Sequence, residues 1–258
     1  MFNEKDIIAR WNADMYDLTE TDTEDVAFAL SLIGPGPKNI LEIACGSGRF
    51  LVPLARAGHK ATGLDFDVYM LQKIGPKAAG LENIAWHRAD VIKDDWGGGF
   101  DVVLIAANFL FNLISDMDYE RAQRLLIEKA ARALAPGGSV YIDYGFTLHP
   151  EAWFNAPGES LVWEGTDSAG TTGRMLLVDS TFDSASGMVR FTRRFELTTA
   201  DGSAIREEIP SSKHFATLEQ IHGWLSASGF AVEEEYGGYG REPIGEGTSR
   251  AIIWARKK

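Results

Sequence analysis

Short apolar runs alternate with segments of helical periodicity over residues 38–145 of the chain. Ile40, Leu41 and Ile43 form one such run, which is typical of a parallel strand that is covered on both faces. Residues 118–134 place alanine and leucine side chains on one stripe and predict an amphipathic helix. Strands and helices that alternate at this spacing indicate a parallel sheet, in which ligands bind at the carboxyl ends of the strands.

The same periodicity predicts elements outside these runs. Thr21 and Glu24 have the spacing of a capping box, so a helix is expected to begin there and to reach Ile33. The other expected elements are helices at residues 49–57, 69–74 and 217–228, and strands at residues 60–64, 230–236 and 249–254.

The pattern changes after Tyr144. Residues 174–182, 188–197 and 204–210 resemble strands, and turn-forming residues separate them. We therefore expect an antiparallel β insertion after the fifth strand of the parallel sheet.

Composition and charge narrow the class of protein. The chain has 258 residues, of which 45% are hydrophobic, so it can bury a sizeable core. Its formal net charge of −12 opposes binding to DNA, RNA or an anionic membrane. The single cysteine allows no intramolecular disulfide, and no metal site is expected. The sequence shows no signal peptide and no apolar run that could span a bilayer, so a cytoplasmic protein is expected.

The stretch from Asn39 to Arg49 predicts a buried strand, a glycine turn and the start of a helix. Gly46 and Gly48 allow the backbone to turn sharply and to approach a ligand closely. Asp65 follows about twenty residues later, where a carboxylate commonly binds a ribose hydroxyl in nucleotide-binding folds. These features together predict a ligand that carries a ribose.

The run Glu42-x-x-Cys-Gly-Ser-Gly resembles motif I of the class I S-adenosylmethionine-dependent methyltransferases. Ala44 stands where the first glycine of that motif often lies. A dinucleotide-binding motif would need a third glycine, and a P-loop would need Gly-Lys-Ser/Thr; the sequence has neither. The resemblance implies a Rossmann-like, doubly wound α/β sheet that is mostly parallel, with an antiparallel last strand.

Three later stretches resemble motifs of the same family in the expected order. They are residues 88–92, 100–108 and 134–143. The resemblance implies that Asp90 holds the adenine amino group and that Tyr16 closes over the cofactor. The cofactor-binding residues that it implies are Tyr16, Glu42, Ala44, Gly46, Gly48, Asp65, Phe66, Asp90, Val91 and Ala107.

The resemblance also implies one domain over residues 1–258 rather than two independent domains. Its expected parts are a helical cap at residues 1–37, the cofactor-binding core at 38–145, the antiparallel insertion at 146–216, and a helix with a β-hairpin at 217–258. The insertion is expected to act as a lid or as a dimer contact, in a monomer or a homodimer.

Methyl transfer from a sulfonium is an in-line displacement that depends mainly on proximity and desolvation. A base is needed only if the nucleophile carries a proton that water does not remove in time. The candidates are Asn108 and Tyr144, which follow predicted strands, and His149 and His214, because imidazole titrates near neutral pH. Arg193 falls on the apolar face of its predicted strand, where it could bind an anionic group of the substrate or extend its head to solvent.

The expected function is therefore methyl transfer from S-adenosylmethionine to nitrogen or oxygen of a small molecule. One alternative is methylation of carbon or of a protein side chain. Another is a non-catalytic regulatory protein that binds S-adenosylmethionine. Nucleic acid is not expected as a substrate, because Ala107 and Asn108 stand where DNA amino-methyltransferases have an Asn/Asp-Pro-Pro-Tyr/Phe run.

Overall fold

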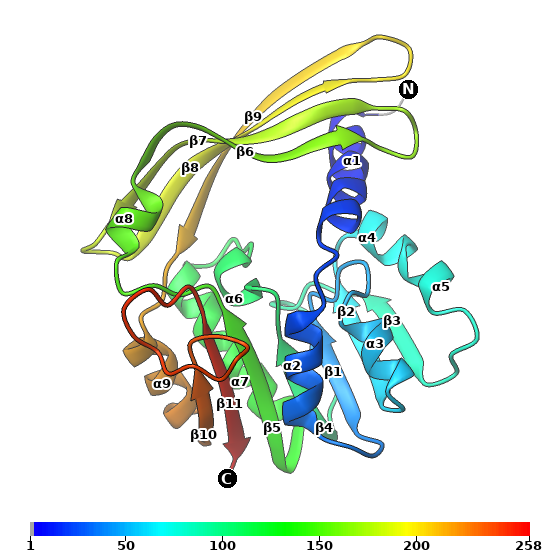
Figure 1. Cartoon of the computed structure of the whole chain (residues 1–258). Helices are drawn as coiled ribbons and strands as arrows, with labels where there is room; N and C mark the ends of the chain where they lie inside the picture. The colour runs from blue at the N-terminus through cyan, green and yellow to red at the C-terminus, as the bar shows by residue number, and fades with distance from the viewer. Residues whose placement is uncertain (1–2) are drawn as a thin grey trace. The chain divides into compact units, whose positions relative to one another are not determined.

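The computed structural model describes residues 3–258. These residues form two compact units, each of which contains one β-sheet (Figure 1). The core unit comprises residues 23–148 and 216–258 and holds a seven-stranded sheet within the described chain. The insertion unit comprises residues 3–22 and 149–215 and holds a four-stranded sheet.

The central sheet of the core unit has the strand order β10-β11-β5-β4-β1-β2-β3. All neighbouring strands pair in parallel except β11, which is antiparallel to both β5 and β10. The strands are β1 (Asn39–Ile43), β2 (Lys60–Asp65), β3 (Ile84–Arg88), β4 (Phe100–Ile105), β5 (Leu134–Tyr144), β10 (Phe230–Tyr236) and β11 (Ala251–Lys257).

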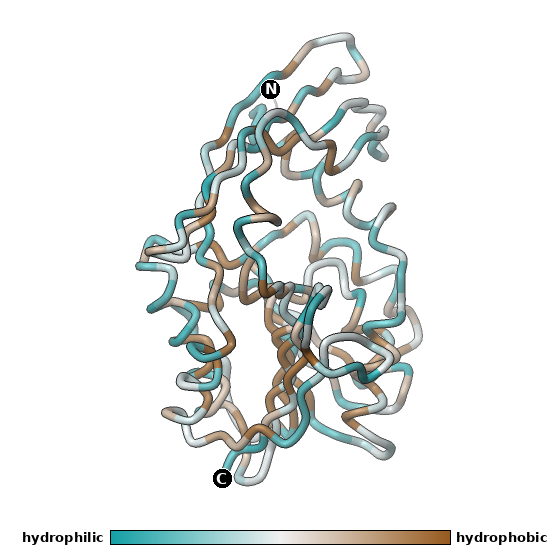
Figure 2. Tube along the Cα trace, turned by 60° about the vertical axis from the view of Figure 1, so that its left-hand side comes forward, coloured by the Kyte–Doolittle hydropathy of each residue, from teal (hydrophilic) through white to brown (hydrophobic). Residues whose placement is uncertain are grey.

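The central strands are buried on both faces, which explains their continuous apolar runs. In β4, Val102 and Leu104 belong to the hydrophobic cluster on one face, whereas the alternate residues Val103 and Ile105 are also fully buried. Figure 2 shows these strands as hydrophobic segments of the trace. Burial on both faces leaves the strand ends as the places where polar side chains can meet a ligand.

Helices cover both faces of the central sheet. α2 (Glu24–Ile33) and α3 (Leu51–Arg56) supply apolar residues to the cluster on one face. On the other face, α7 (Tyr119–Ala133) packs against β4, β5 and α9 (Leu218–Ala227). The shorter helices of the core unit are α4 (Val68–Gln72), α5 (Ile74–Lys77) and α6 (Phe109–Asn112).

The insertion unit combines the first long helix with an antiparallel sheet of strand order β6-β7-β8-β9. Trp11 and Met15 of α1 pack on Met175 and Phe195 of the sheet, and the Trp11 indole donates to the carbonyl of Gly165 at 3.3 Å. Its elements are α1 (Glu4–Thr19), α8 (Pro150–Phe154), β6 (Ala156–Thr166), β7 (Thr172–Asp183), β8 (Met188–Thr198) and β9 (Ala204–His214).

The predicted α/β class, the antiparallel last strand and the antiparallel insertion are confirmed. The capping box at Thr21 is wrong. Thr23 precedes α2, and its side chain accepts no capping hydrogen bond within the described chain. Strand β6 was not predicted, because almost all of its side chains are exposed and show no apolar alternation.

Residues 3–22 pack with the insertion, whereas α2 packs on the central sheet. The expected single domain, with its helical cap and its lid or dimer contact, stays a prediction. Within residues 3–258, no helix combines the length and apolar character needed to cross a bilayer.

Candidate functional site

The glycine loop between β1 and α3 has the backbone conformation that its sequence predicts. Ala44, Gly46 and Gly48 all have positive φ, at 53°, 53° and 83°. The Cys45 N–H donates to the carbonyl of Leu64 at 3.0 Å, and the Gly48 N–H donates to the carbonyl of Cys45 at 2.9 Å. Ala44 thus adopts the left-handed conformation that glycine adopts most easily, at the position where the motif often has glycine.

Asp65 lies at the end of β2, and its carboxylate is hydrogen-bonded to the glycine loop. Its Oδ2 accepts the Gly46 N–H and its Oδ1 accepts the Asp67 N–H, both at 2.8 Å. Burial raises the pKa of Asp65, although these backbone hydrogen bonds oppose the shift. Each carboxylate oxygen has a second acceptor site, so Asp65 can also accept hydrogen bonds from ribose hydroxyls.

Glu42 of β1 is fully enclosed beneath the glycine loop. Burial raises the pKa of Glu42 well above its usual range, against the opposing attraction of Arg49. Its carboxylate accepts a hydrogen bond from the Leu51 N–H, but its buried Oε2 has no partner within the described chain. A buried acceptor without a partner is costly, so this atom suits a ligand that donates a hydrogen bond or carries positive charge.

An ion pair holds the start of α3 against α2. Arg49 donates to Oδ1 of Asp25 at 2.8 Å and to Oδ2 at 2.6 Å, which is the bidentate geometry favoured by guanidinium and carboxylate. Only 15% and 11% of the two side chains are exposed. The pair therefore fixes the helix that follows the glycine loop.

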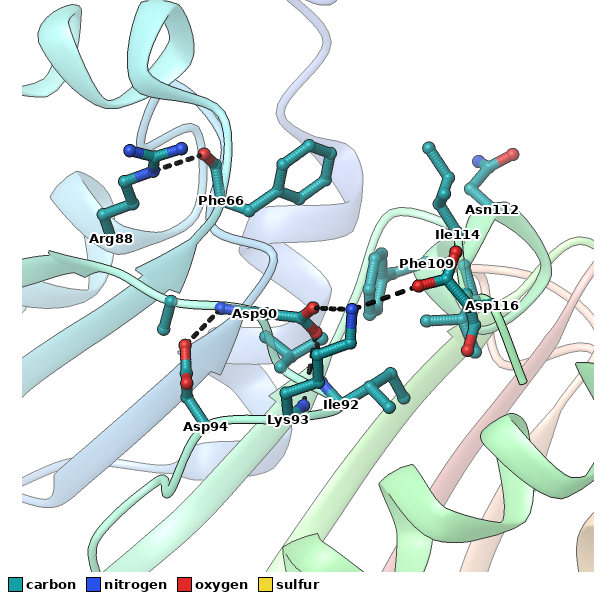
Figure 3. A pocket seen from close by; sticks show the side chains of 14 residues that line it. Phe66, Arg88, Asp90, Ile92, Lys93, Asp94, Phe109, Asn112, Ile114 and Asp116 are labelled. Atoms are coloured by element: carbon teal, nitrogen blue, oxygen red, sulfur yellow. Dashed lines mark hydrogen bonds and ion pairs between the residues drawn. The ribbon is translucent and has the colours of Figure 1, made fainter.

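A cavity of about 490 Å³ opens beside the end of β2 (Figure 3). Phe66 lines it with a ring that is 56% exposed, and Val91 and Ile92 line it from the segment after β3. Phe109 and residues 112–116 line it from α6 and the segment that follows. An exposed aromatic ring near buried aliphatic side chains suits a planar ring such as adenine.

Asp90 lies in this cavity, but its carboxylate is already engaged (Figure 3). Oδ1 accepts the N–H groups of Ile92 and Lys93 at 2.9 and 3.2 Å, and Oδ2 lies 3.3 Å from the Lys93 ammonium. Although partial burial raises the pKa of Asp90, these hydrogen bonds and the ammonium lower it overall. Lys93 also contacts Asp116 at 3.2 Å. The adenine-binding role of Asp90 stays a prediction.

The turn after β4 places two further predicted residues at the end of the sheet. Ala107 and Asn108 both have positive φ, at 51° and 56°. The Asn108 N–H donates to the carbonyl of Asp143 at 3.0 Å, and its Oδ1 accepts the Gly145 N–H at 2.9 Å. The end of β5 therefore holds this strained turn in place.

The remaining predicted residues lie elsewhere. The buried Tyr144 hydroxyl bonds both backbone groups of Ala216, donating to the carbonyl at 3.2 Å and accepting the N–H at 2.7 Å. Tyr16 contacts the Trp163 ring within the insertion unit, with centroids 6.3 Å apart. His149, which is exposed, and His214, which is buried, also belong to that unit.

Arg193 belongs to the insertion unit as well. Its Nε donates to the Ser211 hydroxyl at 3.0 Å, across neighbouring strands of the insertion sheet. The alternation along β8 places it on the same face as Phe195.

Several site residues were not predicted from sequence. They include Asp25, which pairs with Arg49, and the cavity wall formed by Phe109 and residues 112–116. The apolar run from Phe109 to Leu113, directly after the Asn108 turn, was the signal that could have indicated the wall. Among residues 3–258, no group of three or more His, Cys, Asp or Glu side chains could hold a metal ion.

Comparisons with known proteins agree with this geometry. Residues 40–138 match the family described as a methyltransferase domain. A 23S rRNA (uracil(1939)-C(5))-methyltransferase from Aeromonas salmonicida is 33% identical over 88 residues, which is 31% of this chain. The chain covers only 20% of the length of that relative.

Solved structures resemble the chain over most of its length. A S-adenosylmethionine-dependent methyltransferase from Clostridium acetobutylicum has a TM-score of 0.71 and 14% identity, with 99% of each chain covered. The sugar N-methyltransferase KedS8 from Streptoalloteichus has a TM-score of 0.70 and 19% identity, with 94% of this chain and 93% of that chain covered. DesVI from Streptomyces venezuelae has a TM-score of 0.68 and 15% identity, with both chains fully covered.

These likenesses establish the fold, and the match over residues 40–138 coincides with the strands and the glycine loop that form the site. Residues 40–138 therefore match a methyltransferase domain, and the chain has the fold of S-adenosylmethionine-dependent methyltransferases of known structure.

Proposed function

We propose that this protein methylates a nitrogen atom of a small molecule, with S-adenosylmethionine as the methyl donor. The observation that carries the proposal is the shared fold, insertion sheet included, with structures named as N-methyltransferases. These include KedS8 and, at 92% coverage of this chain, a glycopeptide N-methyltransferase. An amino pentose methyltransferase from Micromonospora echinaspora, solved with S-adenosylmethionine bound, covers the whole of this chain with a TM-score of 0.62.

The residues of the site fit this cofactor. Asp65 would accept hydrogen bonds from the ribose hydroxyls, and Phe66 and Val91 would enclose the adenine ring. The unpartnered Oε2 of Glu42 would balance the positive charge of the methionine amino group. When bound, S-adenosylmethionine supplies a methyl group on a positively charged sulfur atom.

The protein contributes to the reaction by positioning the methyl donor and the substrate and by removing water from them. The glycine loop and Asp65 hold the donor, so the substrate nitrogen needs only to approach in line with the departing sulfur atom. Oδ1 of Asn108 is engaged by Gly145, which leaves its amide nitrogen as the group that can donate to a substrate oxygen. We propose Asn108 as a positioning group and keep Tyr144, His149 and His214 as candidates for proton removal.

Arg193 would recognise an anionic group on the substrate. Lys213 of β9 adds a second cation on the same face, and burial together with Arg193 lowers the pKa of Lys213 to about 8. Replacing Arg193 with methionine should raise the substrate KM at least tenfold and leave the affinity for S-adenosylhomocysteine unchanged. Arg190→Met is the matched control, because Arg190 is exposed on the opposite face of the same strand. Equal KM values for wild type and Arg193→Met would remove this role.

Methylation of RNA is the second candidate, because the curated relative acts on 23S rRNA. The net charge of −12 opposes it, and the chain covers a fifth of that relative. A small-molecule substrate is therefore favoured.

The first test is calorimetric titration of S-adenosylhomocysteine into wild type and Asp65→Ala. Micromolar binding that is lost in the variant would support the cofactor site. Labelled methyl transfer to a panel of amino sugars, to hydroxylated analogues that lack the amine, and to 23S rRNA then separates the candidates. Label on the hydroxylated analogues would assign oxygen, and label only on RNA would overturn the small-molecule proposal. Binding without any transfer would indicate a regulatory protein.

A further inference from the structure

A lysine of α5 forms hydrogen bonds to the glycine loop. The Lys77 ammonium donates to the carbonyl oxygen of Ser47 at 3.0 Å and to its hydroxyl at 3.2 Å. Lys77 lies 30 residues after Ser47, and motif I does not include it. Both ends of the contact are sheltered, since Ser47 is only 1% exposed and Lys77 is half-buried.

Helix α5 is itself firmly placed under the loop. Ile74 is fully buried, and a Cβ atom at Gly48 would lie 3.2 Å from its Cγ1. Arg56 donates to the Lys77 carbonyl at 3.0 Å and so fixes the other end of the short helix. Lys77 therefore reaches Ser47 from a backbone that has little freedom to move.

Ser47 stands between two of the three loop residues that have positive φ. Gly46 and Gly48 both have positive φ, and the Gly46 N–H is the group that bonds Asp65. A shift of Ser47 would therefore reach the Gly46–Asp65 hydrogen bond through the backbone of Gly46, because Gly46 directly precedes Ser47. An ammonium bonded to a buried carbonyl and hydroxyl is a charge-assisted contact, which is stronger than an ordinary hydrogen bond.

We propose that Lys77 is a positioning residue for the cofactor: it clamps Ser47 and thereby keeps Gly46 and Asp65 in the geometry that binds the ribose. This inference rests on the cofactor site proposed above. Lys77 acts through the loop and itself contacts neither the donor nor the substrate.

The test compares three variants with wild type by calorimetric titration of S-adenosylhomocysteine and by thermal unfolding of the ligand-free protein. Lys77→Met should weaken binding about tenfold or more, because the loop loses a charge-assisted pair of hydrogen bonds. Lys77→Arg should recover most of the affinity, since a guanidinium can donate to both Ser47 oxygens. Lys60→Met, which removes an exposed lysine at the start of β2, should bind like wild type.

A purely structural lysine would give a different pattern. Lys77→Met would then melt more than about 3 °C below wild type and bind S-adenosylhomocysteine with unchanged affinity, which would overturn the proposal. If Lys77→Met does not fold, Ser47→Ala removes one of the two acceptors. It should still weaken binding about threefold, and unchanged affinity would count against the clamp.

Amide hydrogen exchange of Gly46, Ser47 and Gly48 in the ligand-free protein provides a readout that needs no cofactor. These amides should exchange faster in Lys77→Met than in wild type, while amides of the β4 strand should not change. Equal loop exchange would overturn the proposal. Absence of S-adenosylhomocysteine binding in wild type would instead remove the cofactor site itself, so the two failures can be told apart.

Discussion

Asp65 and Glu42 are buried carboxylates at the ends of neighbouring strands, and they differ in how many of their oxygens are hydrogen-bonded. Asp65 has a backbone N–H on each oxygen, whereas Glu42 keeps an unpartnered oxygen within the described chain. In the ligand-free protein this buried, partly paired charge is unfavourable, and a donor group on the cofactor would relieve it. The proposed role of Glu42 is therefore that its unfavourable burial in the free protein is relieved when the cofactor binds.

Glu42→Gln should raise the melting temperature of the ligand-free protein at pH 7 and weaken S-adenosylhomocysteine binding. The pKa of Glu42 is raised in the folded state, chiefly by burial, so the unfolded chain ionises first as the pH rises. Wild type therefore loses stability above about pH 4.5, and the variant does not. The two proteins should melt alike below that pH and separate above it. A constant difference across pH 4 to 8 would contradict this account.

Gly63→Ala should lower the free energy of unfolding by about 2 kcal/mol, because it overpacks the region beneath the glycine loop. A Cβ atom on Gly63 of β2 would lie 2.6 Å from Sγ of Cys45 and 2.7 Å from Cδ2 of Leu51. Gly223→Ala in α9 is the control, since the added Cβ would meet no atom of the described chain within 4 Å beyond its chain neighbours and the backbone of its own helix. It should be neutral or stabilise by up to about 1 kcal/mol. Urea denaturation measures both, and equal effects would refute the packing argument.

Elements of the core unit are joined near the site by contacts that the hydrophobic pattern does not encode. α2 covers the central sheet through its apolar stripe, yet Asp25 on the same helix holds Arg49 at the start of α3. α5 similarly adds Lys77 beneath the loop. Apolar packing thus places the helices, and single polar contacts set their exact relation to the glycine loop.

Arg49→Met should lower the free energy of unfolding by about 3 kcal/mol, because Asp25 would keep a largely buried charge without its bidentate partner. Arg124→Met breaks the exposed pair with Glu128, in which the side chains are 62% and 36% exposed. That control should change stability by no more than about 0.5 kcal/mol. Urea denaturation of both variants tests the difference, and a small effect of Arg49→Met would show that the pair contributes little.

On the scale of the whole molecule, the predicted cofactor residues except Tyr16 lie in the core unit, whereas Tyr16 and the predicted anion-binding Arg193 lie in the insertion unit. A ligand that binds only the folded core unit must stabilise it by mass action. The size of that stabilisation depends on ligand concentration and affinity alone.

S-adenosylhomocysteine at one hundred times its Kd should stabilise the protein by about 2.7 kcal/mol and raise its melting temperature by about 5–10 °C. Asp65→Ala at the same ligand concentration should show no shift. Thermal unfolding followed with and without ligand measures this. An equal shift in the variant would place the ligand away from Asp65.

Local sequence determined the strand pattern, the antiparallel insertion, the glycine loop and the position of Asp65. These features depend on spacings of a few residues along the chain, and backbone geometry carries such spacings directly into structure. Gly46 and Gly48 illustrate this, since the sharp turn expected from them is present, with positive φ at both residues. The prediction of the cofactor class rests on the same local spacings.

Tertiary structure alone decided the rest. The Asp25–Arg49 pair joins residues 24 apart and the Lys77–Ser47 clamp joins residues 30 apart, so no local pattern encodes them. Asp90 shows the same limit, because sequence named the residue and only the fold showed its carboxylate held by its own turn and by Lys93. Sequence by itself determined which chemical groups stand at the strand ends. Packing decided which atoms of these groups remain open to a ligand, because their hydrogen-bond partners come from segments that meet only in the folded chain.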